Sequence, residues 1–147
     1  MPSAFVPGEP MGKARPRLGR NGRVYTPDAT RKREQEIARL WWSPPIPIEI
    51  PVAVRVTAFY SRPKDHILSD GVSLSAKGKR GPVPMRTPDL DNVVKLALDA
   101  LNGVAFRDDR QVQSVEATRW WAGDDGPGIL IQVRALRPAE LSGSSAP

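Results

Sequence analysis

Hydrophobic residues cover most of one predicted helix, which runs from Asn92 to Leu101 and leaves a single polar stripe. At roughly 100° per residue, its apolar side chains surround all but a narrow part of the circumference. The stripe contains Asp91, Lys95 and Asp99, with Asn92 at its border. A helix this apolar is normally buried on most sides, so the stripe must face solvent, an ion-pair partner or a functional site.

Alternation of side chains from Val52 to Tyr60 predicts a strand of about ten residues that is partly covered on both faces. Three further strands are predicted, over residues 3–7, 111–121 and 129–136. The segment 123–128 suits a turn between the last two, so we expect them to pair as a C-terminal hairpin.

A second helix is predicted from Thr26 to about Trp42. Thr26 can cap it, and Pro27 suits its first position. One face is apolar and ends in Trp41 and Trp42, which we interpret as core or subunit contacts. The other side is basic and is interpreted equally as exposed surface or as a DNA contact, through Arg31, Lys32, Arg33 and Arg39.

The order of these elements indicates an α+β domain, with a small mixed sheet and two main helices. The chain has 147 residues, which is enough for one domain with a real core. We place that domain over residues 1–136. The tail over residues 137–147 is rich in Ser, Gly, Pro and Ala, and we expect it to be disordered.

Charge and composition narrow the class of protein. Lysine and arginine number 22 against 16 acidic residues, which gives a net charge of +6 and favours polyanionic partners without defining specificity. The chain has no cysteine, which excludes a disulfide scaffold, and no signal peptide, so we expect a cytoplasmic protein. No apolar run approaches the length of a membrane span, and we expect no membrane partner.

Basic residues gather in two predicted loops. The loop over residues 11–25 contains no acidic residue and is interpreted as an arm that grips phosphates, with a solvated loop as the alternative; its cations are Lys13, Arg15, Arg17, Arg20 and Arg23. A long loop over residues 61–88 leads into the acidic segment and is unusual in a compact domain. It contains Lys77, Lys79, Arg80 and Arg86, together with the only histidine, His66, which we expect at its surface.

Four carboxylates flank the predicted 92–101 helix. Asp89 and Asp91 lie at its start, and Asp108 and Asp109 follow the Asn102-Gly103 turn. If that turn brings the second pair back to the first, three or four carboxylates converge, which is tolerable mainly around a divalent cation. Because the ligands are hard oxygens and the chain has no cysteine, the pattern favours magnesium or manganese over zinc.

Each part of this pattern also has an ordinary structural interpretation. Asp89 is well placed to cap the helix. Asp91 and Lys95 have the spacing of a solvated ion pair, worth roughly 0.3–0.5 kcal/mol. Asp108 and Asp109 could form a plain turn. From the residues alone these alternatives stay open.

The string DLDNVVKLALDALNG, followed closely by DDRQV, resembles the RusA family of Holliday junction resolvases, which is common on phage and prophage genomes. In that family an Asp-Leu-Asp-Asn segment opens a helix, a lysine follows four residues after the second Asp, and Asp-Asp-x-Gln-Val comes later. The residues that match are Asp89, Asp91, Asn92, Lys95, Asp108, Asp109, Gln111 and Val112. Weaker similarity covers residues 6–10 and the first basic loop.

The resemblance implies a Mg²⁺-dependent endodeoxyribonuclease, with Mn²⁺ as a substitute, that resolves four-way DNA junctions by paired symmetric nicks during recombination or repair. It also implies a two-fold homodimer, with no small-molecule cofactor. The metal ligands would be Asp89, Asp91 and Asp109, and Asp108 is a candidate fourth. A phage or prophage origin would fit the family.

The remaining polar residues of the helix acquire roles from the same resemblance. Lys95 would hold the scissile phosphate or stabilise developing negative charge. We expect Asn92 to orient a metal ligand and Asp99 to hold Lys95 through an ion pair. Two other functions compete: a non-catalytic protein that binds branched DNA, and a metal-dependent nuclease that prefers forks, flaps or RNA.

Overall fold

A computed structural model describes residues 1–15, 17–25 and 27–142, and its main feature is a four-stranded mixed sheet with the order β1-β6-β4-β5. β4 (Val52–Tyr60) lies between β6 (Gly128–Ala135), which is antiparallel to it, and β5 (Val112–Trp121), which is parallel. β1 (Ser3–Pro7) adds to the outer edge of β6. The α+β class with a small mixed sheet is therefore confirmed.

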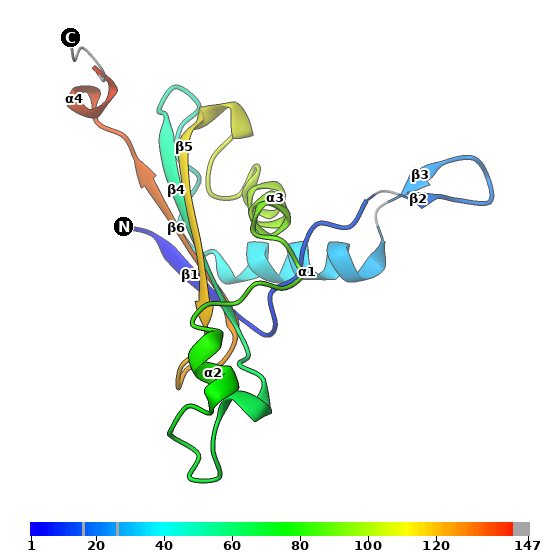
Figure 1. Cartoon of the computed structure of the whole chain (residues 1–147). Coiled ribbons are helices and arrows are strands. Elements are labelled where there is room, and N and C mark those ends of the chain that lie inside the picture. Colours follow the sequence, from blue (N-terminus) through cyan, green and yellow to red (C-terminus); the bar gives the residue numbers. More distant parts are fainter. Residues whose placement is uncertain (16, 26, 143–147) are drawn as a thin grey trace.

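Two long helices cover one face of this sheet (Figure 1). α1 (Asp28–Leu40) packs against β1 and against α3 (Leu90–Leu101), which contacts β4 and β5. The buried core lies between the helices and the alternate side chains of β4 and β6, with Leu96, Leu101 and Ile131 fully buried. The predicted apolar helix is thus buried on most sides, with its polar stripe outside the core.

The predicted C-terminal hairpin is wrong, because β4 separates the two strands that would form it. β4 is the most completely buried strand, with every second side chain from Val52 to Tyr60 buried. A strand this deeply buried gains most from neighbours on both edges, because its backbone N–H and C=O groups then all find partners. The six residues between β5 and β6 are enough to cross the end of β4, where Ala122 N donates to Tyr60 O.

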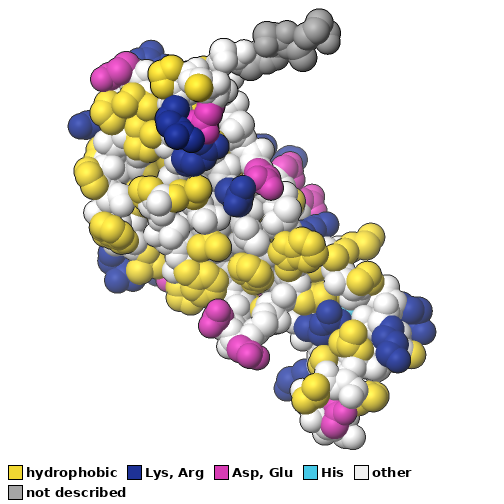
Figure 2. Space-filling view, turned by 90° about the vertical axis from the view of Figure 1, so that its left-hand side faces the viewer, with side chains coloured by type: hydrophobic (Ala, Val, Ile, Leu, Met, Phe, Trp, Pro, Cys, Tyr) yellow, Lys and Arg dark blue, Asp and Glu magenta, His cyan; other side chains and the backbone are white. Residues whose placement is uncertain are grey.

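The opposite face of the sheet has no helix over it, and Figure 2 shows hydrophobic side chains in a band across the side of the molecule that lies away from the helices. Phe59 and Trp120 are paired neighbours there, and Phe5 is paired with Leu130. Phe5 is 37% exposed and Trp120 is 49% exposed. The sheet is therefore a two-layer structure with one open face.

The first basic loop forms a short hairpin of β2 (Arg17–Leu18) and β3 (Val24–Tyr25), which projects away from the body (Figure 1). The predicted loop over residues 61–88 also has local structure, namely η1 (Lys64–His66) and α2 (Ala76–Arg80). Both segments were expected to be irregular. The Asn21-Gly22 turn, in which Gly22 has a φ of +76°, closes the hairpin.

The ends of some predicted elements also need correction. α1 begins at Asp28 without a side-chain cap, and the predicted capping residue Thr26 lies outside the described residues. Trp41 is buried, as expected of a core residue, whereas Trp42 is 81% exposed. The expected disordered tail contains α4 (Pro138–Leu141), and residues 143–147 lie outside the described range. Within the described range, no helix has the length and apolar character needed to cross a membrane.

Candidate active site

Two carboxylates at the start of α3 make no side-chain hydrogen bond or ion pair within the described part of the chain. Asp89 occupies the N-cap position, yet its side chain makes no capping hydrogen bond. Asp91 lies in the first turn and is exposed. Neither side chain has a hydrogen-bond or ion-pair partner among the described residues. The capping interpretation of Asp89 and the Asp91–Lys95 ion pair are therefore both absent from the described structure.

A cavity of about 400 Å³ brings these carboxylates together with cationic side chains. Its walls combine the N-terminal part of α3 with the segment that precedes the β2–β3 hairpin, and they consist of Lys13, Ala14, Arg15, Asp89, Asp91, Asn92 and Lys95. Lys95 is exposed and, like the two aspartates, has no hydrogen-bond or ion-pair partner in the described part of the chain. The cavity therefore places two carboxylates, which are hard oxygen donors, beside the unpaired ammonium group of Lys95.

The segment before the hairpin packs tightly on the start of α3. Lys13 N donates to Asn92 O over 3.1 Å. A Cβ on Gly12 would lie 3.0 Å from the Cβ atoms of both Asn92 and Pro88, so a larger residue would push this segment away from the helix. Pro88 is held in turn by the Tyr60 hydroxyl, which donates to its carbonyl over 2.6 Å. The end of β4 and the N-terminal segment therefore position the cavity.

Lys13 has a different position from the one predicted. Its ammonium group pairs with Glu34 of α1 and, over 3.1 Å, with Asp99 of α3, and its side chain is only 21% exposed. Burial by itself would lower the pKa of Lys13, but the hydrogen bonds to Glu34 and Asp99 outweigh it, and the pKa is raised. Lys13 therefore links the two helices as a permanent cation.

The predicted ion pair between Asp99 and Lys95 is wrong for the same reason, since Asp99 pairs with Lys13. Asp99 and Lys95 share the stripe, but the N-terminal segment reaches Asp99 from outside the helix. Because Lys13 lies 86 residues before Asp99, the spacing of residues along the helix could not predict this ion pair. Asn92 likewise contributes its backbone carbonyl to Lys13, which sequence reasoning missed.

The second acidic pair belongs to η2 (Asp109–Gln111), a turn that leads into β5. Asp108 caps this turn by accepting from Arg110 N over 2.9 Å, and this hydrogen bond lowers the pKa of its carboxyl. The Gln111 side chain completes the capping box by accepting from Asp108 N, and from Arg107 N over 2.7 Å. Asp109 is exposed. The turn interpretation therefore holds for Asp108.

Gln111 is a structural residue whose importance was not predicted. It is 5% exposed, and its amide nitrogen donates to the carbonyls of Ile46, Pro47 and Ile50, the segment before β4. A buried glutamine with this many partners fixes the turn in place. Its position in the Asp-Asp-x-Gln-Val string was the only signal that could have found it.

The expected convergence of all four carboxylates is wrong within a single chain. The described residues contain no group of three or more acidic, histidine or cysteine side chains that could hold a metal ion. Asp89 is tethered near Tyr60, at the end of β4, while Gln111 tethers the second pair to the residues before β4. A nine-residue strand is roughly 26 Å long, so the two pairs are tethered to opposite ends of it.

Some of the predicted phosphate-binding residues are exposed, whereas others form ion pairs within the chain. Arg17, Arg20 and Arg23 are exposed on the projecting hairpin, and Lys79 and Arg80 are exposed on α2. Lys77, in contrast, pairs with Asp65 over 2.7 Å.

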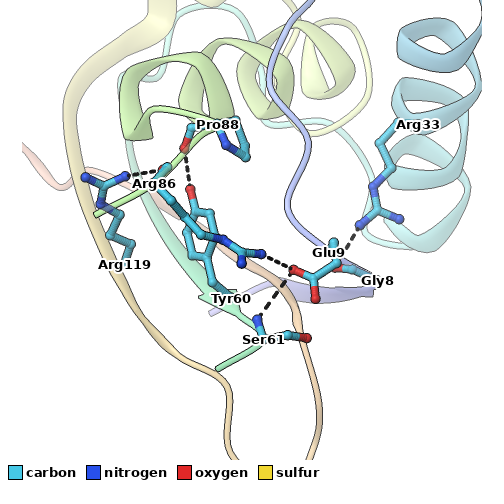
Figure 3. A network of polar contacts seen from close by, with 8 residues as sticks. All are labelled: Gly8, Glu9, Arg33, Tyr60, Ser61, Arg86, Pro88 and Arg119. Atoms are coloured by element: carbon cyan, nitrogen blue, oxygen red, sulfur yellow. Dashed lines mark hydrogen bonds and ion pairs between the residues drawn. The ribbon is translucent and has the colours of Figure 1, made fainter. Parts of the chain in front are cut away.

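Arg86 belongs to a network that ties the N-terminal segment to β4 (Figure 3). Its guanidinium lies 3.4 Å from Glu9, which also accepts from Ser61 N, and 5.8 Å from the Tyr60 ring centroid. Arg119 donates to the Arg86 carbonyl over 3.0 Å. In the same view Arg33 reaches the backbone of the N-terminal segment, where it donates to the Pro7 and Gly8 carbonyls.

Two further predictions about individual residues are wrong. Arg33 was assigned to the exposed basic side of α1, but it is 9% exposed. His66 was expected at a loop surface, but it is 8% exposed and makes an edge contact with Trp121 over 5.5 Å. The backbone of α2 covers it so closely that a Cβ on Gly78 would lie 2.3 Å from His66 O.

Comparison with known proteins decides the family. The model of a family described as Endodeoxyribonuclease RusA matches residues 7–134. The chain belongs to the RusA family. It is also 30% identical over 137 residues to YqaN of Bacillus subtilis (strain 168), a protein described as uncharacterized, with 89% of this chain and 94% of that protein covered. Membership of the RusA family implies an endodeoxyribonuclease that resolves Holliday junctions, and the cavity at α3 is its candidate active site.

Proposed function

We propose that this chain is a divalent-metal-dependent endodeoxyribonuclease that cuts four-way DNA junctions by paired, symmetric nicks. The observation that carries the proposal is the pair of unpartnered carboxylates, Asp89 and Asp91, in one cavity with an unpartnered lysine, Lys95. A surface built only to bind DNA gains nothing from carboxylates that repel phosphate. The two aspartates therefore favour catalysis over passive binding.

The donor set suits a hard cation. Asp89 and Asp91 offer carboxylate oxygens, with no sulfur and no imidazole in the cavity wall, which favours Mg²⁺ or Mn²⁺ over Zn²⁺. The chemistry that such an ion supplies when bound is activation of a water and neutralisation of charge at the phosphate.

The chain's own residues position the substrate around these carboxylates. Lys95 lies one turn beyond Asp91 and holds the scissile phosphate, where its charge stabilises the negative charge that grows on the phosphate oxygens. Arg15, in the cavity wall, extends this grip toward the β2–β3 hairpin. The exposed arginines of the hairpin, Arg17, Arg20 and Arg23, hold phosphates further along the backbone.

A two-fold homodimer resolves the separation of the two acidic pairs. Asp109 is exposed and its carboxyl lies within hydrogen-bond reach of the Asp108 carboxyl, yet it is tethered away from Asp89 and Asp91 in its own chain. In a symmetric dimer, Asp109 of the partner subunit completes each pair. Two such sites, related by the two-fold axis, also match the two symmetric cuts that a four-way junction needs.

The first experiment compares cleavage of a labelled four-way junction and of linear duplex, with Mg²⁺ and with EDTA. Paired symmetric nicks in the junction alone, abolished by EDTA, are expected. Asp91→Asn should lower the cleavage rate by roughly 10²–10³-fold or more, as for a lost electrostatic group at a reaction centre, while junction binding persists. Asp125→Asn, an exposed aspartate in the β5–β6 turn, is the matched control and should cleave normally.

Other outcomes would assign other functions. Tight junction binding without cutting by the wild type would favour a non-catalytic branched-DNA-binding protein. Equal cutting of both substrates would retain the acidic site and remove the junction specificity. Joint loss of folding and binding in Asp91→Asn would make Asp91 a structural residue.

A mixing experiment tests whether the partner subunit contributes Asp109. Asp91→Asn and Asp109→Asn should each be inactive as homodimers. After the two are mixed and subunits exchange, a shared site leaves one intact site in every mixed dimer, so about a quarter of the wild-type sites return, seen as single nicks. If each site belongs to one chain, every site keeps one lesion and no activity returns.

A further inference from the structure

Glu9 is an exposed carboxylate in the N-terminal segment, beside the path that the proposed function gives to DNA. The later residues of the same segment, Lys13, Ala14 and Arg15, line the cavity at α3, whereas Glu9 does not. A carboxylate in this position repels the phosphates of a DNA backbone. Its presence therefore calls for a role other than catalysis.

Two donors converge on one oxygen of Glu9 (Figure 3). The backbone N–H of Ser61 and the guanidinium of Arg86 both donate to Glu9 Oε2, each over 3.4 Å. Both distances exceed the usual range of about 2.7–3.2 Å for such hydrogen bonds. The side chains of Arg86 and Glu9 are 46% and 48% exposed, and exposed ion pairs are weak and screened by salt. An anion from solvent can therefore compete with Glu9 for these donors.

The two donors are held in place by contacts that do not involve Glu9. Ser61 directly follows β4, whose last residue, Tyr60, is fully buried. The Arg86 guanidinium lies 5.8 Å from the Tyr60 ring centroid, and Arg119 donates to the Arg86 carbonyl over 3.0 Å. A backbone N–H beside a guanidinium is a combination that binds phosphate oxygens. The pair of donors is thus preformed for an anion.

This pair of donors also lies close to the proposed reaction centre. The Tyr60 hydroxyl holds the carbonyl of Pro88, the residue before Asp89. Arg86 precedes Asp89 by three residues, a span of at most about 11 Å in an extended chain. Phosphates of one DNA strand are spaced about 3.4 Å apart along the helix axis. A phosphate bound by Ser61 and Arg86 therefore lies within a few nucleotides of the one held at Asp89.

We propose that the Ser61 N–H and the Arg86 guanidinium form a phosphate-binding site, in which the Glu9 carboxylate takes the place of a DNA phosphodiester until the substrate displaces it. This inference rests on the proposed function and adds to it a residue that opposes binding. A carboxylate and a phosphodiester each carry one negative charge on two acceptor oxygens, so the same donors accept either group. The consequence is weaker retention on ordinary duplex, the abundant competitor of a rare junction.

Glu9→Gln separates this role from a structural one, because the two roles predict opposite signs. If Glu9 competes with phosphate, its neutralisation should tighten binding of a labelled duplex and of a labelled four-way junction, both in EDTA at low salt, by roughly two- to fivefold. If Glu9 only ties the N-terminal segment to β4, the same change should weaken binding. Glu49→Gln, which removes an exposed carboxylate before the start of β4, controls for net charge and should change the affinity less than about 1.5-fold.

Arg86→Gln provides the second measurement. It should weaken binding of both DNAs and lower the slope of log Kd against log salt concentration by about one. Adding Glu9→Gln to this variant should have no further effect, because the donor for which the two anions compete is gone.

An unchanged or weaker affinity in Glu9→Gln, or an equal gain in the Arg86→Gln background, would overturn the phosphate site. Binding in EDTA needs no catalysis, so a wild-type protein that binds DNA but fails to cut junctions would contradict the proposed function alone. A chain that binds neither DNA would contradict both proposals.

Discussion

The two acidic pairs of this chain differ in what surrounds them. Asp89 and Asp91 begin a helix whose capping they do not perform, and their carboxylates face a cavity. Asp108 caps η2, and the buried side chain of Gln111 fixes this turn by hydrogen bonds to the segment before β4. The first pair is available for chemistry, while the second pair includes one residue committed to folding and one, Asp109, that is exposed. Two similar sequence patterns therefore lie in different surroundings, because the Asp108 carboxylate accepts a backbone hydrogen bond and the Asp89 carboxylate does not.

This contrast predicts that substitutions near the first pair change rate without changing stability. Lys95→Ala should lower the cleavage rate by roughly 10²-fold, with the junction Kd changed by less than about threefold and the Tm unchanged, because Lys95 is exposed and unpaired in the described structure. Single-turnover cleavage and binding at the same salt concentration measure the two effects. Lys95→Arg, which keeps the charge, should retain the affinity.

Equal losses of rate and affinity would make Lys95 a residue that binds DNA backbone generally. A lowered Tm would give it a structural role and remove the contrast between the two regions.

Near the second pair, the opposite result is expected. Gln111→Ala removes five hydrogen bonds, three of which the Gln111 side chain donates to the carbonyls of Ile46, Pro47 and Ile50. The expected loss is about 2–3 kcal/mol of unfolding free energy, measured by urea denaturation. Gln35→Ala, an exposed glutamine on α1, should change stability by less than about 0.5 kcal/mol.

Cleavage by folded Gln111→Ala should fall less than cleavage by Lys95→Ala, since Gln111 does not line the cavity. An unchanged unfolding free energy would show that the turn before β5 is held by other contacts.

Local patterns predicted the elements that depend on neighbours in sequence. The apolar side chains from Val93 to Leu101 identified α3, and the alternation of buried and less buried side chains identified β4. The pairing of β5 with β4 depended on which strand takes the central position between two neighbours. The periodicity of a sequence does not give this information. The partners of Lys13 and the burial of His66 depended on segments distant in sequence. The acidic residues could be named from the motif, but their separation follows from the three-dimensional path of the chain.

Under the proposed function, the short length of the β2–β3 hairpin limits how this arm could hold DNA. From Arg17 to the turn at Asn21, the arm extends over about four residues, or roughly 13 Å. This is close to the width of the major groove, about 12 Å. One arm can therefore bridge a single groove but cannot encircle a duplex, so a bound helix can enter and leave sideways without unthreading.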